Sequence, residues 1–366
     1  MKQEEREERE VEDEIVFDTP DSQISNSNHR KQFLIFQISQ RLIHGDLHSR
    51  IEAAKDLRNL ARKSSPKSRS NLGASSLIQP LVCMLLSPNL DAREASLLAL
   101  LNLASRNERN KIKIVAAGAI PPLLELLKFQ NLSLRELATA AILTLSAATS
   151  NKPVILSAGA TSLLVQILIS GSVQAKVDAV TALYYLSACT GSENSSMMLD
   201  PGAVAPLIDL LKECKKHSKF AEKTTSLLQI ISNSEEGRTA ISNLDGGILT
   251  LVQTVEDGSL VSTEHAVGIL LSMCQTCRET YREPILKEGA IPGLLRLTVE
   301  GTTEAQERAR RLLDLLRDSP QEKTMSSADL ERIVYKIAAE VDGIDQAAET
   351  AKRLMQEMVQ RRLNTV

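Results

Sequence analysis

Leucine-rich segments recur along the chain, each preceded by a glycine and a pair of small or apolar residues. The pattern is clearest at 116–128 (AAGAIPPLLELLK) and 287–299 (KEGAIPGLLRLTV), and it returns more loosely at 157–169 and 200–212. The glycines of the five copies are Gly118, Gly159, Gly202, Gly246 and Gly289, which are 41 to 44 residues apart. Self-similarity at a fixed period of this length is typical of a solenoid of helical repeats.

Each period predicts three helices. A short helix such as 110–117 ends at the glycine, which can adopt the left-handed conformation that suits a helix C-terminus. A second helix follows, and Pro121, Pro206 and Pro292 fall in its first turn, where proline costs no hydrogen bond. A longer third helix, as at 133–148, carries apolar or small residues at helical spacing.

The pattern predicts about seven units over residues 33–320. An earlier copy at 75–86 lacks the glycine, and the first unit lacks a short helix. The charged residues of the first and last units lead us to expect polar outer faces at the two ends of the array.

The two flanks differ from the repeats. Residues 1–21 hold ten acidic and three basic residues, a net charge of −7. We therefore expect residues 1–32 to be a disordered acidic tail. Its simplest role is to increase solubility, and a second hypothesis is that it occupies a basic surface of the repeats. Residues 321–366 contain two amphipathic stripes around Asp342 and Gly343. They predict a helical hairpin that closes the solenoid, or alternatively one that binds a partner or a second copy.

Composition narrows the class of protein. The 366 residues include no Trp and carry a net charge of −3, which argues against a nucleic-acid-binding protein that acts through bulk charge. Five scattered cysteines indicate reduced thiols. No stretch is apolar enough for a signal peptide or a membrane span. We expect a protein of the cytoplasm, the nucleus or both.

No motif for catalysis or cofactor binding is present. The sequence contains no phosphate-binding loop, zinc-protease helix or nucleophile elbow, so we predict no catalytic, cofactor or metal site. His44 and His48 are separated by a predicted turn, and Cys274 and Cys277 form a single pair where structural zinc needs four ligands. Cys274 aligns with small core residues of other repeats and is expected to be a buried thiol.

The segment DAREASLLALLNLASRNERNKIKIVAAGAIPPLLELL, residues 91–127, resembles the armadillo consensus. Residues 33–318 are similar to the armadillo region of plant U-box proteins and of their armadillo-only relatives. The resemblance implies an all-α fold, a right-handed armadillo superhelical solenoid of about seven three-helix repeats with a C-terminal helical hairpin. The polar residues before the first repeat do not resemble a U-box, so ubiquitin transfer by this chain alone is not expected.

The resemblance also implies that the third helices line a concave face. At one position of these helices the chain has Asn59, Asn102, Thr144 and Tyr185, and nine residues earlier it has Arg50, Arg93, Arg135 and Lys176. We predict that these eight residues form a partner-binding groove, because the fork of arginine suits carboxylate and phosphate groups. In the alternative, glutamates at the next position (Glu94, Glu136, Glu222 and Glu264) support the helix N-termini, pair with the arginines and leave little free charge.

The predicted function is a non-catalytic scaffold or adaptor that binds an extended, acidic or phosphorylated protein segment. Kinases and ubiquitin-pathway proteins are the expected partners. The alternative is the substrate-binding component of a ubiquitin ligase that acts in trans. A receptor for basic nuclear-import signals is not favoured, because the tryptophans that hold lysine side chains in that family are missing.

Overall fold

The computed structural model describes residues 20–73, 75–188 and 199–317, together with the single residues 335, 336, 349, 352 and 353. The chain divides into two units, residues 1–310 and 311–366. The description below concerns the first unit, apart from the end of the last helix. The residues described are helical or lie in short connections, and none of them belongs to a β-strand.

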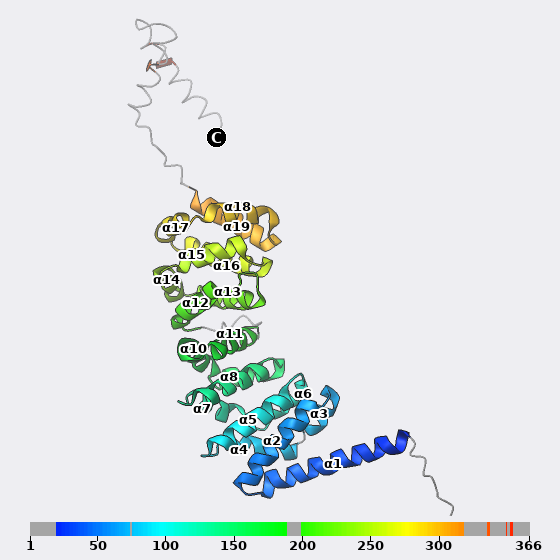
Figure 1. Cartoon of the computed structure of the whole chain (residues 1–366). Helices are drawn as coiled ribbons and strands as arrows, with labels where there is room; N and C mark the ends of the chain where they lie inside the picture. Colours follow the sequence, from blue (N-terminus) through cyan, green and yellow to red (C-terminus); the bar gives the residue numbers. More distant parts are fainter. Residues whose placement is uncertain are drawn as a thin grey trace, which may run out of the picture. The chain divides into compact units, whose positions relative to one another are not determined.

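The helices occur in sets of a short first helix, a second helix and a longer third helix (Figure 1). The first repeat has α1 (Pro20–His44) and α2 (Leu47–Lys63). Repeats two to four contain α3 (Pro66–Leu72), α4 (Ser75–Met84), α5 (Leu90–Ala104), α6 (Glu108–Ala116), α7 (Ile120–Leu127), α8 (Leu132–Ser146), the 3-10 helix η1 (Thr149–Asn151), α9 (Lys152–Ser157), α10 (Ala160–Ser170) and α11 (Val173–Ser187). Repeats five to seven contain the 3-10 helix η2 (Pro201–Ala203), α12 (Val204–Glu213), α13 (Lys219–Ile231), α14 (Glu235–Asn243), α15 (Gly247–Asp257), α16 (Leu260–Thr276), α17 (Arg278–Lys287), α18 (Ala290–Glu300) and α19 (Thr303–Leu316).

Helices of the same rank pack against one another in successive repeats. The third helices contact each other in the order α2, α5, α8, α11, α13 and α16, and the second helices α7, α10, α12, α15 and α18 do the same. Figure 1 shows the repeats as successive layers. Aliphatic side chains such as Leu97, Leu103 and Leu183 are fully buried between the layers. The predicted all-α armadillo solenoid is therefore confirmed.

Four of the five repeat glycines have the conformation that the sequence predicts. Gly118, Gly159, Gly246 and Gly289 have φ of 83°, 79°, 69° and 77°. This left-handed region is costly for residues with a Cβ atom and lets the chain turn from the first helix into the second. Gly202 is different, because it lies inside η2 and donates its N–H to Asp200 Oδ1 at 2.7 Å. Pro201 begins that turn and makes a left-handed glycine unnecessary.

Buried asparagines join the third helices of repeats two and three to the repeat that follows. Asn110 Nδ2 donates to Leu103 O at the end of α5 (3.0 Å) and to Arg69 O in the preceding first helix (2.9 Å). One repeat later, Asn151 Nδ2 donates to Leu145 O (3.0 Å) and to Lys111 O (3.1 Å). Leu145 O and Arg69 O also accept the backbone N–H groups of Ala148 and Gly73, so there the amide adds a second hydrogen bond to the carbonyl group. The asparagines thereby tie one repeat to the next.

The N-terminal end differs from the expectations. Helix α1 begins at Pro20, so residues 20–32 are helical where we expected a disordered tail, and residues 1–19 lie outside the described part. The outer face of the first repeat is also less polar than expected, because Phe33 and Phe36 are 62% and 58% exposed. No first helix precedes α1 in the described residues to cover them. The predicted hairpin at 321–366 lies almost wholly outside the described residues.

Replacing Asn151 by Ala should lower the free energy of unfolding by roughly 1–3 kcal/mol, because the two hydrogen bonds that its buried amide donates to Leu145 O and Lys111 O are lost. Urea denaturation followed by circular dichroism measures the change. Asn59→Ala is the matched control, since Asn59 is exposed on α2, and it should leave stability unchanged or slightly higher. Equal effects of the two substitutions would show that the inter-repeat amide does not stabilise the array.

Candidate functional site

The predicted cations occupy one position in the third helices of repeats one to four. These helices start after Asp46, Asn89, Asn131 and Ser172, and each of these side chains accepts a backbone N–H from the first turn. The fourth residue after each cap is Arg50, Arg93, Arg135 or Lys176. We call these four residues the basic edge, because they lie where the loop from the second helix enters the third.

Two arginines of the basic edge contact neighbouring loops. Arg93 Nε donates to Ser87 O at 2.5 Å, and its guanidinium carbon lies 4.9 Å from the ring centroid of Phe129 in the next repeat. Arg135 Nη2 donates to Ser170 O at 2.7 Å, at the end of α10. Each arginine has five N–H donors, so most donors remain available after these contacts.

The other two cations are less constrained. Arg50 Nε is buried and has no hydrogen-bond partner in the structure. Lys176 lines an open hollow of about 540 Å³ together with Ile169, Val173 and Pro206. Within the described residues, no ion pair joins any of the four cations of the basic edge to a carboxylate. The alternative of arginine–glutamate pairing is therefore not what the structure shows.

The second predicted column consists of Asn59, Asn102, Thr144 and Tyr185, which we call the third-helix column. Asn59 is exposed, whereas Asn102 Nδ2 donates to Leu98 O at 2.7 Å and Thr144 Oγ1 donates to Ala140 O at 2.8 Å. The ring of Tyr185 lies 5.6 Å below Lys223 Nζ of the next repeat. Two of the four polar groups thus bond their own helix, and one ring stacks under a lysine.

The structure does not bring the two predicted columns together. They are nine residues apart in the same helices, and at 3.6 residues per turn this separation is two and a half turns. The basic edge and the third-helix column therefore point to opposite sides of each helix, separated by roughly 13 Å along its axis. The predicted groove residues divide into two surfaces.

Glutamates at the position after the basic edge in repeat three, and at the equivalent position in repeats five and six, connect successive third helices. Glu136 Oε2 accepts from Ser172 Oγ at 2.5 Å, Glu222 Oε1 from Ser259 Oγ at 2.8 Å, and Glu264 Oε2 from Thr302 Oγ1 at 2.6 Å. Each hydroxyl also caps the third helix of the next repeat. The sequence reading placed these glutamates at the N-terminus of their own helix and missed this contact. The sequence pattern that could have revealed this contact is a Ser or Thr 36 to 38 residues after the Glu.

A second feature that the sequence reading missed lies in repeats five to seven. Gly268 is inside α16, and a Cβ atom there would lie 2.7 Å from Gln229 Nε2 and 2.9 Å from Arg308 Nη1. Gln229 Oε1 is 2.5 Å from His265 Nδ1, and Arg308 Nη1 donates to Glu264 O at 3.2 Å. Burial lowers the pKa of His265, so this polar network holds a neutral imidazole near pH 7.

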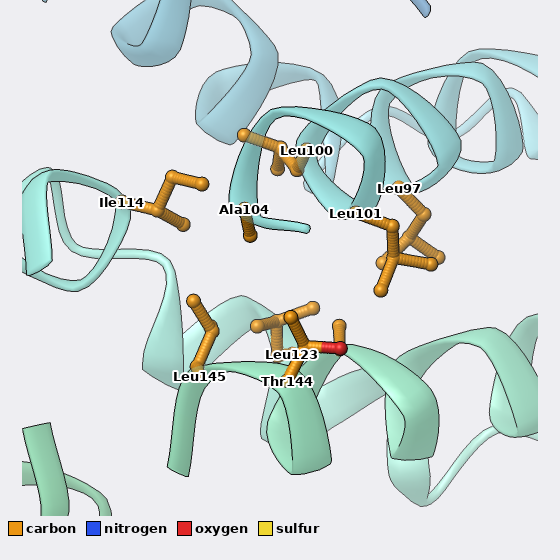
Figure 2. A pocket seen from close by; sticks show the side chains of 9 residues that line it. Leu97, Leu100, Leu101, Ala104, Ile114, Leu123, Thr144 and Leu145 are labelled. Atoms are coloured by element: carbon orange, nitrogen blue, oxygen red, sulfur yellow. The ribbon is translucent and has the colours of Figure 1, made fainter. Parts of the chain in front are cut away.

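The pocket in Figure 2 is a packing gap in the core. It lies between α5 and α8, and the figure shows leucine side chains of both helices pointing into it. The nine lining residues are Leu97, Leu100, Leu101, Ala104, Ile114, Leu123, Ala141, Thr144 and Leu145. Its volume is about 10 Å³, which is no more than the space that one water molecule needs. Thr144 therefore faces the packing between repeats two and three.

No helix of the described residues is by itself long and apolar enough to cross a membrane; Thr149–Ser157 and Ala160–Ser170 meet that test only as a pair, with an 85° bend between them.

Among the described residues, no three His, Cys, Asp or Glu side chains are grouped so that they could hold a metal ion. Cys274 is buried, as expected, while Cys277 and Cys83 are exposed.

Comparisons with known proteins agree with this architecture. Residues 107–147 match the armadillo/β-catenin-like repeat, and residues 181–335 match the plant U-box protein ARM repeat region. A solved structure from work on a phosphorylation switch in the interaction between cadherin and β-catenin aligns with a TM-score of 0.64 at 18% identity, covering 88% of this chain and 65% of that one. An engineered protein aligns with a TM-score of 0.58 at 22% identity, covering 87% and 77%. These likenesses concern the fold.

The similar curated proteins are plant U-box proteins. U-box domain-containing protein 45 of Arabidopsis thaliana is 31% identical over 264 residues, and U-box domain-containing protein 17 of the same plant is 32% identical over 275. The matched regions cover 71% and 74% of this chain but only 34% and 37% of those proteins, so the chain spans about a third of their length.

The chain is an armadillo-repeat protein, and armadillo arrays generally act as protein-binding scaffolds. Within that class, its repeats are of the kind found in the armadillo region of plant U-box proteins.

Thiol reactivity should follow burial. Burial raises the pKa of Cys274 to about 11, so its reactive thiolate is scarce at mildly alkaline pH. We expect an alkylating reagent to modify Cys83 and Cys277 first and Cys274 only after unfolding, as measured by peptide mass spectrometry. Burial also raises the pKa of Cys214, which should react at an intermediate rate. Equal rates for Cys274 and Cys83 in the folded protein would contradict this order.

Proposed function

We propose that the chain is a non-catalytic adaptor that binds an extended, acidic or phosphorylated segment of another protein across its third helices. The observation that carries the proposal is the basic edge, in which four consecutive repeats place a cation at an equivalent position and none of the four pairs with a carboxylate in the part of the chain that the structure describes. Arginine binds carboxylate and phosphate groups through two parallel hydrogen bonds, and a ladder of arginines suits a segment with several such groups.

The distribution of charge supports an acidic partner at this end of the array. Residues 33–188, which form repeats one to four, contain 17 Lys and Arg and 9 Asp and Glu, a net charge of +8. Residues 189–366 contain 21 Lys and Arg and 27 Asp and Glu, a net charge of −6. A net charge near zero for the whole chain therefore hides a basic half, which attracts acidic ligands at a distance and orients their approach.

The test is affinity capture from plant extract with quantitative mass spectrometry. The full chain is compared with Arg93→Glu/Arg135→Glu, and we expect the captured proteins with acidic or phosphorylated segments to fall at least about tenfold, since each lost charged hydrogen bond costs roughly 1.5–3 kcal/mol. Treating the extract with phosphatase separates phosphorylated from acidic partners.

The matched control is Lys67→Glu/Arg109→Glu. These residues are exposed on the first helices α3 and α6 of the same two repeats, so the control makes the same charge change away from the basic edge. Because Arg93 also stacks on Phe129, Arg93→Gln/Arg135→Gln is added, and circular dichroism checks that every variant remains helical. Equal capture by the edge and control variants would refute the basic edge as the binding surface.

The second candidate function is the substrate-binding component of a ubiquitin ligase that acts in trans. The observation in its favour is that the matched relatives are U-box proteins and that this chain corresponds to their armadillo region. A reconstituted reaction with a captured partner and a separate U-box protein tests it. Ubiquitin on the partner only when the chain is added supports this function, and transfer that does not depend on the chain refutes it.

A further inference from the structure

An exposed aliphatic side chain lies beside each cation of the basic edge. The first residue of the third helix in repeats one to four is Leu47, Leu90, Leu132 or Val173, with exposed fractions of 45%, 43%, 64% and 73%. The cation follows three residues later, and residues three apart lie on the same side of a helix. Four consecutive repeats therefore present an apolar group next to a positive charge, and we call this surface the apolar–basic edge.

The edge ends in the hollow between repeats four and five. Ile169, which is 56% exposed, lines the hollow with Val173 and Lys176, and Pro206 lies at the start of the next repeat. An open hollow of about 540 Å³ is large enough to receive a bulky aliphatic side chain. The edge therefore offers apolar binding space in addition to charge.

The later repeats do not continue the pattern. In α13 the first residue is Lys219 and the fourth is Glu222, and in α16 the exposed Leu260 is followed by the buried Thr263. The combination of an aliphatic and a cationic side chain is thus confined to repeats one to four, which also carry the net charge of +8. This restriction separates the edge from the ordinary scatter of exposed apolar residues.

We infer that the apolar–basic edge binds a partner segment in which aliphatic and acidic side chains recur together. Each of repeats one to four binds one aliphatic and one acidic side chain of that segment. Burial of apolar surface supplies affinity, and the cations select carboxylates over other polar side chains. The inference rests on the proposed function. It adds that the ligand carries aliphatic side chains and that the binding site lies at the N-terminal ends of the third helices.

The spacing of the repeats sets the period of the ligand. Packed helices are about 8–10 Å apart. A chain in the extended polyproline II conformation advances about 3.1 Å per residue and returns to the same side every three residues. One repeat therefore corresponds to about three residues of an extended partner. The expected ligand carries an aliphatic residue followed by acidic residues at a period of about three.

The experiment uses a fluorescent peptide of four Leu-Asp-Glu triplets and the full chain, with affinity measured by anisotropy. A peptide of four Ser-Asp-Glu triplets has the same charge and no aliphatic side chain. We expect the leucine peptide to bind at least tenfold more tightly, and Leu132→Ser/Val173→Ser to remove that difference. Leu260→Ser is the matched control, because it changes the same helix position outside the edge, and it should have no effect.

The outcomes separate this inference from the proposed function. The two peptides could bind with equal affinity, and both could lose binding to the Arg93→Glu/Arg135→Glu variant. That result would overturn the apolar contribution and would still support binding of acidic segments at the basic edge. No binding of either peptide would overturn the inference, while the capture experiment would still judge the proposed function.

The N-terminal segment VEDEIVFD, residues 11–18, also combines aliphatic and acidic residues. The test replaces Ile15, Val16 and Phe17 by Ser in the full chain and measures binding of the leucine peptide. Tighter binding would show that residues 11–18 compete for the edge. That result would overturn the inference that a separate partner occupies it.

Discussion

Stacking in this array is reinforced by side-chain hydrogen bonds to carbonyl groups at the ends of four third helices, α2, α5, α8 and α13. Packing one repeat on the next removes these groups from water, and an unpaired carbonyl would cost free energy at every layer. Asn110 and Asn151 supply amide donors from the following repeat, and Arg69 and Arg238 donate to the ends of α2 and α13 in the same way. Between these hydrogen bonds lie apolar layers in which Leu97, Leu103 and Leu183 are fully buried.

A second set of contacts acts at the other end of the third helices. The carboxylates of Glu136, Glu222 and Glu264 accept from the hydroxyl that caps the next third helix. Glu136, which follows Arg135, is occupied in this way, whereas Glu222 and Glu264 lie in repeats five and six, outside the basic edge. Among the described residues no carboxylate pairs with a cation of the basic edge, and the proposed binding of acidic segments depends on this property.

The repeat geometry could be predicted from the sequence to a large extent. Gly118 and Gly289 mark turns with a positive φ, and the prolines after them are favoured in the first turn of a helix, so the two signals together predict where one helix ends and the next begins. Gly202 shows where this reasoning fails, because Asp200 and Pro201 form a different turn that the period alone did not distinguish. The opposite orientation of the two predicted columns was also present in the sequence, as nine residues are two and a half helical turns.

The sequence by itself determined the class of fold, the number and order of the repeats and the identity of the charged positions, because these follow from local helix chemistry repeated at a fixed period. Only the tertiary structure decided what those positions contact. The placement of Arg93 over Phe129, of Arg135 against Ser170 and of Lys176 beside a hollow depends on how one repeat is set on the next. That arrangement is fixed by packing between residues about forty positions apart, and no local pattern in a single repeat contains it.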